Sequence, residues 1–150
     1  MTFDQPSECP FYLISRVTLQ VTSALKKGMA AAGIDAVKPA YLGVLLCLWA
    51  EDGRKAVELA RCARLEPSSM TGLLDRMARD GLVSRTPDPN DRRVQRICLT
   101  DAGMAVRTPA EKVTTQVLGQ VFDGIAPADL ARTMEVLQQV LTNIKEDSPS

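Results

Sequence analysis

Residues 65–100 have the sequence LEPSSMTGLLDRMARDGLVSRTPDPNDRRVQRICLT, and this stretch decides the fold. Pro67 is pre-organised for the first turn of a helix and Gly81 is suited to follow the last turn, so we predict a helix over residues 67–80. Small polar and charged side chains cover most of this helix. Its apolar residues recur at helical spacing and predict one buried stripe, formed by Met70, Leu73, Leu74 and Met77.

A shorter helix is predicted before this one, over residues 55–63, with Val57, Leu59 and Ala60 facing inward. Two short helices joined by a tight turn are typical of a helix-turn-helix.

The helix-turn-helix is followed by residues 82–86 and 94–99, which show strand-like patterns on either side of a segment rich in turn residues. We predict that these two strands pair as a two-stranded wing. The prolines between them are expected to lie in the loop rather than in the hydrogen-bonded ladder.

Longer helices are predicted on both sides of this unit. Residues 11–32 place apolar side chains at every third or fourth position, which predicts one amphipathic helix that ends at Gly33. Residues 38–51 are almost wholly apolar and predict a core helix in which Trp49 packs.

Two more helices are predicted in the last third of the chain. Thr100 is a suitable N-cap for a helix over residues 101–122, and Pro109 is expected to kink it. Pro127 begins a final helix whose apolar residues repeat with coiled-coil-like spacing, at Leu130, Met134, Leu137, Leu141 and Ile144.

The first and last helices carry apolar stripes outside the compact central unit. Packed on each other and on a second copy of the chain, they would form a dimerisation layer; the alternative is packing within one subunit. We therefore predict a mainly α fold with a small β wing, a winged helix-turn-helix. Residues 1–36 form the N-terminal dimerisation helix, 37–100 the DNA-binding domain, and 101–150 the helices that complete the dimerisation layer, all as one integrated domain.

Composition excludes several classes of protein. The chain has no histidine, which removes His-based catalytic triads and imidazole metal ligands, so we expect no enzyme, no metal and no cofactor. The four cysteines are far apart in sequence and include no C-x-x-C pair, which argues against a zinc site and against a disulfide scaffold.

No apolar run is long enough for a membrane helix, and the N-terminal residues MTFDQPSECP lack the features of a signal peptide. We therefore expect a cytoplasmic protein with no membrane partner.

The net charge is zero, but the charges are unevenly placed. Residues 54–96 contain ten Lys or Arg against six Asp or Glu, a net charge of +4, whereas residues 1–53 carry −1 and residues 97–150 carry −3. A phosphate-binding surface needs a local positive potential rather than a basic protein, so this distribution is compatible with DNA binding. A solvated charged face would give the same pattern.

Four short motifs follow one another along the chain: E-L-A at 58–60, P-S-S-M-T-G-L-L-D-R-M at 67–77, G-L-V at 81–83, and D-R-R at 91–93 followed by L-T at 99–100. Together with the order of helices they resemble the MarR family of winged-helix transcriptional regulators, over nearly the whole chain. The resemblance implies a homodimer that represses promoters by binding a palindromic operator in double-stranded DNA. It also implies release of the DNA when a small molecule or an oxidant reaches the sensor layer.

The same resemblance assigns DNA-binding roles by position. Ser68, Ser69, Thr71 and Arg76 would face the major groove or its phosphates, and the wing-tip residues Asp91, Arg92 and Arg93 would complete the set. Arg93 would enter the minor groove, with Asp91 orienting it by a charge-assisted bond. Arginine suits the negative potential of a narrow A·T minor groove, and short hydroxyl side chains near a helix N-terminus can reach phosphates and base edges.

Three residues depart from the family pattern. Gly72 stands where many members have an arginine, Arg64 where the turn often has a glycine, and Ala63 where a larger apolar residue is common. A positive φ is costly for a residue with a Cβ, so we expect the turn at Arg64 to adopt a different geometry.

The effector is not determined by the sequence. Ligand-binding members of the family suggest a small phenolic or other aromatic compound, and Cys9, near the start of the first helix, is a candidate oxidant sensor. The alternatives to a ligand-released repressor are therefore a cysteine-based oxidant-sensing repressor and a winged-helix module that binds proteins.

Overall fold

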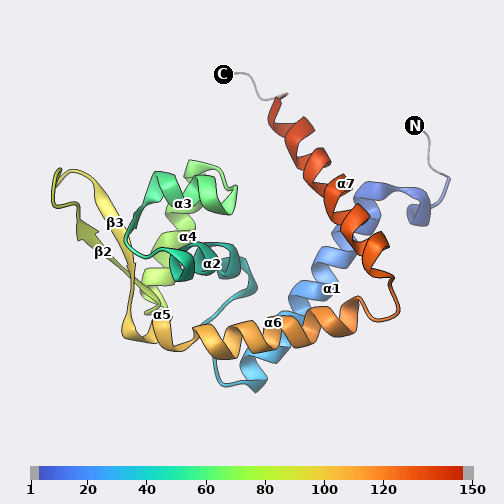
Figure 1. Ribbon diagram of the computed structural model, residues 1–150, viewed down its shortest axis with the longest axis horizontal. Helices are drawn as coiled ribbons and strands as arrows, with labels where there is room; N and C mark the ends of the chain where they lie inside the picture. The colour runs from blue at the N-terminus through green and yellow to red at the C-terminus, as the bar shows by residue number, and fades with distance from the viewer. Residues whose placement is uncertain (1–3, 147–150) are drawn as a thin grey trace. The chain divides into compact units, whose positions relative to one another are not determined.

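The structure is a computed structural model that describes residues 4–146, and these residues are mostly helical with one small antiparallel sheet (Figure 1). The mainly α architecture with a β wing is confirmed. The helices are α1 (Pro10–Ala31), α2 (Leu42–Ala50), α3 (Ala56–Ala63), α4 (Pro67–Arg79), α5 (Asp101–Ala105), α6 (Arg107–Val121) and α7 (Pro127–Glu146), with short 3-10 turns at Pro6–Glu8 and Pro39–Tyr41. The strands are β1 (Arg54–Lys55), β2 (Val83–Pro87) and β3 (Gln95–Leu99).

The chain forms two compact units, Met1–Val117 and Leu118–Ser150, which are described separately below. The first contains the helix-turn-helix and the wing. The second consists of the end of α6 and of α7.

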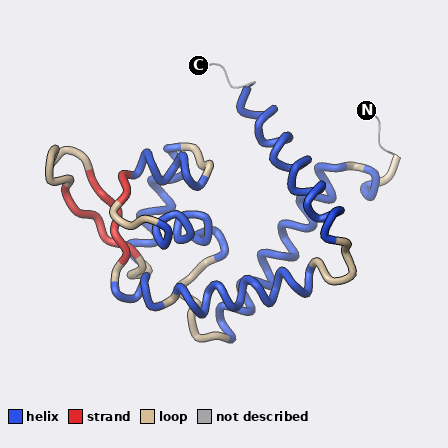
Figure 2. Tube along the Cα trace, viewed as in Figure 1, coloured by secondary structure: helices blue, strands red, loops and turns tan. Residues whose placement is uncertain are grey.

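The sheet has three strands in the order β1-β3-β2, all antiparallel, whereas two were predicted (Figure 2). The additional strand β1 is two residues long, with Arg54 opposite Ile97, and so short a segment has no alternation to reveal it. Pro87 is the last residue of β2, opposite Gln95, so its predicted place in the loop was wrong. Because β2 is at the edge of the sheet, a proline there is tolerated.

The core of the first unit is one apolar cluster. It includes all four residues of the predicted stripe on α4, each at most 5% exposed, together with Val44, Leu45 and Leu48 of α2, Leu59 of α3 and Ile97 of β3. The stripe on α4 is thereby confirmed. Val57 is 51% exposed, so its predicted inward orientation was wrong: Leu59 and Ala60 fill the buried face of α3 without it.

The turn between α3 and α4 has Arg64 in the left-handed conformation, with φ 53° and ψ 42°. The N–H of Leu65 donates to the carbonyl of Ala60 at 2.9 Å, which closes the end of α3. The prediction of a different turn geometry was wrong. The helix end requires this conformation, and Arg64 adopts it at a cost on the order of 1 kcal/mol.

The helix predicted over residues 101–122 is divided into α5 and α6 at Val106. Thr100 caps α5 as predicted, because its Oγ1 accepts a hydrogen bond from the Gly103 N–H at 3.0 Å. The interruption lies three residues before Pro109, which has no N–H to bond the carbonyl of Ala105 and is the third residue of α6. The disruption expected of Pro109 is therefore present as a break between two helices.

The cysteines differ from expectation. Cys47 of α2 and Cys62 of α3 form a disulfide that was not predicted from the sequence, although one bond is not the disulfide scaffold that was argued against. The two residues are 15 positions apart, and the packing of α2 on α3 brings their Cα atoms to 6.2 Å. Sequence spacing alone does not reveal such a contact. Within the described residues, Cys9 and Cys98 are free.

Most of the exposed large apolar side chains in the described residues lie on two helices, α1 and α7. On α1 these are Phe11, Tyr12, Leu13, Ile14, Val17 and Leu19. On α7 they are Met134, Val136, Leu137, Val140, Leu141 and Ile144. No helix in the described part of the chain is long and apolar enough to cross a membrane.

Gly103 permits a close approach of α5 to the wing. A Cβ at this position would overlap the backbone carbonyl oxygen of Leu82, which cannot move as a side chain can. Gly103→Ala is therefore expected to lower the free energy of unfolding by about 1–3 kcal/mol, measured by denaturant titration.

Gly119→Ala is the matched control, because a Cβ at this helical position meets no atom within 4 Å. It is expected to be neutral or to add up to about 1 kcal/mol of stability. Equal unfolding midpoints for the two variants would contradict the packing of Gly103 against Leu82.

Candidate nucleic-acid interface

The exposed face of α4 begins with Ser68, Ser69 and Thr71, all exposed. Pro67 is the first residue of the helix, and the hydrogen-bonded ladder starts with the N–H of Met70 bonded to Glu66. The N–H groups of Ser68 and Ser69 therefore have no acceptor within the helix. Backbone donors and hydroxyl groups at a helix N-terminus form an arrangement that suits a phosphate oxygen.

Arg76 lies one turn further along the same helix and is exposed. Its Nη1 is 3.6 Å from the position that a Cβ on Gly72 would occupy. Gly72 thus leaves room for the Arg76 side chain to lie along the helix surface. A guanidinium group, that of Arg76, therefore lies beside position 72, where the sequence has no arginine of its own.

Two polar contacts hold α4 to its neighbours. The Tyr41 hydroxyl donates to Asp80 Oδ2 at 2.7 Å, and burial, followed by this hydrogen bond, raises the pKa of Tyr41 above its usual value. Asp75 forms an ion pair of 2.5 Å with Arg85 of β2. Because that ion pair is largely exposed, it contributes little to stability.

The wing loop is organised around Asp88, which is 2% exposed and is the one buried charged residue among those whose side chains the structure describes. Its Oδ1 accepts the N–H of Asn90 at 2.8 Å and of Asp91 at 3.2 Å, and its Oδ2 accepts Arg96 Nε at 2.6 Å. The Asn90 N–H bond and the Arg96 guanidinium hold the pKa of Asp88 below its ordinary value, against the opposing effect of burial. Arg96 also donates to the Gly53 carbonyl at 2.8 Å, which connects the wing to the turn after α2.

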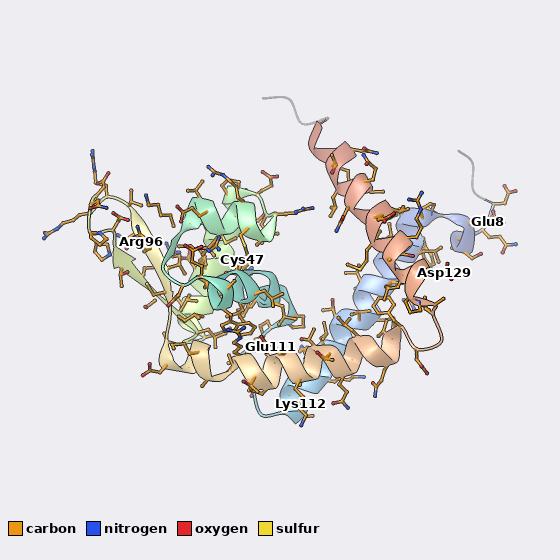
Figure 3. All side chains as sticks on the ribbon, viewed as in Figure 1. Glu8, Cys47, Arg96, Glu111, Lys112 and Asp129 are labelled. Atoms are coloured by element: carbon orange, nitrogen blue, oxygen red, sulfur yellow. A yellow bond between two sulfur atoms is a disulfide. The ribbon has the colours of Figure 1, made fainter. Side chains whose placement is uncertain are left out.

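Sequence reasoning missed Asp88 and its partner Arg96. Figure 3 labels Arg96, which lies near the start of β3 in the wing. A signal was present, because an aspartate that begins a Pro-Asn turn commonly bonds the backbone two residues on. The partner Arg96 could not be chosen among the nearby arginines without the strand register.

The predicted wing-tip residues are held in the loop beyond this network. Asp91 Oδ1 accepts the backbone N–H of Arg93 at 3.0 Å and its Nε at 3.3 Å, so the expected contact from Asp91 to Arg93 is present. The Arg93 side chain is nevertheless 93% exposed, and Arg92 is exposed as well. The predicted residues thus form two groups, one on the outer face of α4 and one on the wing loop, both exposed to solvent.

A hollow of about 190 Å³ lies between α2 and α6. Its walls are mostly apolar, with a carboxylate and two hydroxyl groups among them; the lining residues are Leu42, Leu46, Trp49, Ala110, Glu111, Thr114 and Thr115. Arg107 donates to Glu111 at 2.9 Å and to the Trp49 carbonyl at 3.1 Å, so α6 is bonded to the end of α2 beside this hollow. The candidate sensor Cys9 precedes the first turn of α1 and is half-buried.

Comparisons with known proteins by sequence and by structure agree on one protein family. The MarR family model matches residues 39–94, the segment from the 3-10 turn before α2 to the end of the wing loop. BadR of Rhodopseudomonas palustris, a transcriptional activatory protein, is 30% identical over 120 residues, which are 79% of this chain and 69% of BadR.

Two solved relatives have the same fold over most of their length. A MarR-family regulator from Silicibacter pomeroyi is 30% identical, with a TM-score of 0.68, and the match covers 93% of this chain and 92% of that one. CouR of Rhodococcus jostii RHA1, bound to p-coumaroyl-CoA, is 28% identical with a TM-score of 0.74, covering 93% and 96% of the two chains. CouR has also been solved as a repressor bound to a 23-mer DNA duplex. These relatives are regulators rather than enzymes, in agreement with the prediction from composition.

The role of Asp88 can be tested by Asp88→Asn, which keeps the shape of the side chain and removes its charge. The wing amides of Asn90 and Asp91 are expected to exchange hydrogen faster, because their acceptor is weakened, while the helical amides of α4 keep their protection. Asp75→Asn removes the same charge from an exposed ion pair with β2 and is the control; it should leave the protection of the Asn90 and Asp91 amides unchanged. Equal wing protection in wild type and Asp88→Asn would contradict the network.

The lowered pKa of Asp88 also predicts a pH dependence. A carboxyl whose pKa is lower in the folded state stabilises the fold above its unfolded value, 3.8, and this contribution is lost as the pH falls through the folded value. Wing protection in the wild type should therefore persist down to pH 3.8 and fall below it. Asp88→Asn should lack this step, and an identical acid profile in both proteins would refute it.

Proposed function

Because the chain belongs to the MarR family of transcriptional regulators, we propose that it binds a palindromic operator in double-stranded DNA as a homodimer and represses transcription until a small-molecule effector releases it. The observation that carries this proposal is the pair of exposed polar groups on α4 and on the wing loop. Helix and wing together are the elements with which winged helices contact adjacent grooves of DNA.

The roles of the individual residues follow from their chemistry. Ser68, Ser69, Thr71 and Arg76 contact the major groove or its phosphates, while Arg93 enters the minor groove with Asp91 orienting it and Arg92 adding positive charge. CouR, a relative of similar fold, has been solved on a DNA duplex, which supports this use of the fold. The net charge of +4 over residues 54–96 favours the approach of DNA.

A homodimer is supported by the exposed apolar side chains of α1 and of α7. Large apolar side chains exposed in such numbers on one helix are typical of a protein interface rather than of a solvated face. We assign residues 1–36 and 101–150 to dimerisation and 37–100 to DNA binding. Two-fold symmetry would present two α4 helices to successive major grooves of one duplex.

The hollow between α2 and α6 is our proposed effector site. A small phenolic compound suits it, because the ring can pack on Leu42, Leu46 and Trp49 while its hydroxyl donates to the Glu111 carboxylate. CouR, whose structure holds p-coumaroyl-CoA, supports an aromatic ligand. The regulator would act in the cytoplasm, where it meets both the effector and the DNA.

The proposal is tested with the duplex upstream of the chain's own coding sequence, by footprinting and by titration at several salt concentrations. We expect protection with two-fold symmetry, a dimer in solution, and an affinity that falls as salt rises. A monomer that binds this duplex and a random duplex equally would refute the DNA-binding role and favour a protein-binding module.

Arg93→Ala tests the wing. We expect operator affinity to fall about 10- to 100-fold at matched salt, because a minor-groove contact is lost, while the dimer and its helix content stay unchanged. Lys112→Ala, an exposed cation on α6, is the control and should bind within a factor of about two of the wild type. Unchanged affinity in Arg93→Ala would refute the role of the wing.

A further inference from the structure

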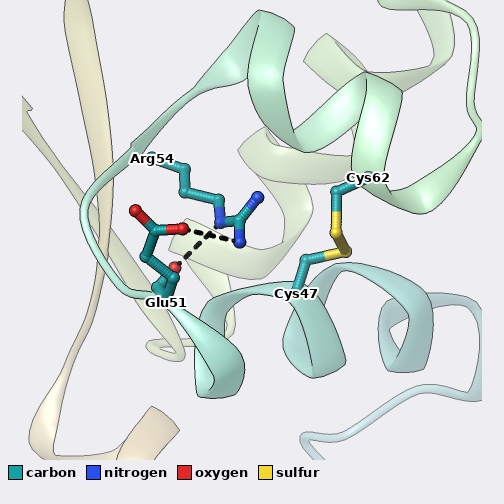
Figure 4. The surroundings of a disulfide bond; sticks show 4 residues. All are labelled: Cys47, Glu51, Arg54 and Cys62. Carbon is teal, nitrogen blue, oxygen red and sulfur yellow. Dashed lines mark hydrogen bonds and ion pairs between the residues drawn. A yellow bond between two sulfur atoms is a disulfide. The ribbon is translucent and has the colours of Figure 1, made fainter.

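The Cys47–Cys62 disulfide joins α2 to α3, the first helix of the helix-turn-helix (Figure 4). Its two ends are unlike each other. Cys47 is 6% exposed and belongs to the apolar core, whereas Cys62 is exposed. The bond therefore ties a surface position on α3 to the interior of the molecule.

The position of this disulfide along the chain allows it to affect the orientation of α4. Cys62 is the penultimate residue of α3, two residues before Arg64, whose φ is 53°. The strained turn leads directly into α4, whose outer face carries Ser68, Ser69 and Thr71. At the other end, α2 is fixed in the core by Val44, Leu45 and Leu48. The disulfide thus anchors α3 next to the turn that sets the direction of α4.

The chemistry of the site favours exchange with thiols. Disulfides are uncommon where a thiol pool keeps cysteines reduced, and those that form there are usually transient or redox-sensing. An exposed cysteine of a disulfide is open to attack by a thiolate. The neighbours Arg61 and Arg64 are both exposed, and their positive charges attract an anionic thiolate.

We propose that the Cys47–Cys62 disulfide is a redox-controlled site, and that its reduction by a low-molecular-weight thiol weakens the binding of DNA by α4. This inference rests on the DNA-binding function proposed above. The two cysteines are distinct from Cys9, and the low-molecular-weight thiol is the reductant.

The exchange proceeds in two steps. A thiolate attacks the sulfur of Cys62, the Cys47–Cys62 bond breaks, and Cys47 leaves as a thiolate that takes up a proton. This first attack leaves a mixed disulfide between Cys62 and the small thiol. A second thiolate then attacks the sulfur of the small thiol in that mixed disulfide and releases Cys62 as a thiolate, which takes up a proton. Two thiols are oxidised to one disulfide, and the protein gains two cysteine thiols. An oxidised thiol of the same class reverses the reaction.

Reduction changes the fraction of molecules that hold α4 in the geometry of this structure. Without the tether, the end of α3 is held by the packing of Leu59 and Ala60, and the positive φ of Arg64 favours local unwinding. When a smaller fraction is competent to bind, the apparent dissociation constant rises in inverse proportion. We expect operator affinity to fall about three- to tenfold on reduction.

The experiment uses the full-length protein, oxidised with glutathione disulfide or reduced with dithiothreitol, titrated with the operator duplex. Alkylation and mass measurement count the thiols, with two expected in the oxidised protein and four in the reduced one. Cys62→Ser should bind like the reduced wild type under both conditions. Cys98→Ser, which removes a free cysteine in β3, is the control and should keep the redox response.

Equal affinity in both states, four thiols after oxidation, or a redox response that persists in Cys62→Ser would each overturn the inference, as would tighter binding after reduction. If neither state binds any duplex, the proposed function fails instead. The tether is then judged by thermal unfolding, where a midpoint lower by about 5–10 °C in the reduced protein supports it and an unchanged midpoint overturns it. Cys47→Ala removes the buried cysteine of the bond, and its thermal unfolding midpoint is measured in the same way.

Discussion

The burial of one face of α4 is the constraint on which the rest of the molecule depends. Met70, Leu73, Leu74 and Met77 are inaccessible or nearly so, and the helical repeat then directs the intervening residues to solvent. Core packing and the proposed DNA contact are thus two consequences of a single periodicity. Because α2, α3 and the sheet supply the partners of the buried face, any change in their positions is transmitted to the exposed one.

The wing depends on a different kind of interaction. Its loop is held by a buried carboxylate rather than by an apolar core. Asp88 accepts hydrogen bonds from two backbone N–H groups and from the Arg96 guanidinium. The contact of Arg96 with the Gly53 carbonyl then fixes the loop to the end of α2. Arg93 can therefore remain almost fully exposed on a loop whose backbone is held in place, which would lower the conformational entropy lost in the proposed binding to DNA.

What could be predicted from the sequence follows this division. Elements defined by periodicity and by end signals were predictable, such as the stripe of α4, its start at Pro67 and the Thr100 cap, because local backbone chemistry decides them. Contacts between segments distant in sequence were not. The Cys47–Cys62 bond and the pairing of Asp88 with Arg96 require the packing and the strand register, and Arg64 shows that a helix end can impose a left-handed residue where local preference opposes it.

The helix α2 connects the two proposed controls. Leu42, Leu46 and Trp49 line the hollow beside α6, while Cys47, the neighbour of Leu46, carries the bond to α3. Adjacent residues on a helix point about 100° apart, so one short helix can face a ligand on one side and the helix-turn-helix on another. Since one face of α2 is buried in the core, a ligand that moves this helix would also move the anchor of α3 and the turn that follows. An effector and a thiol would then both act on α4 through α2. With the disulfide intact, a movement of α2 would be passed on to α3 and α4 more completely than in the reduced protein.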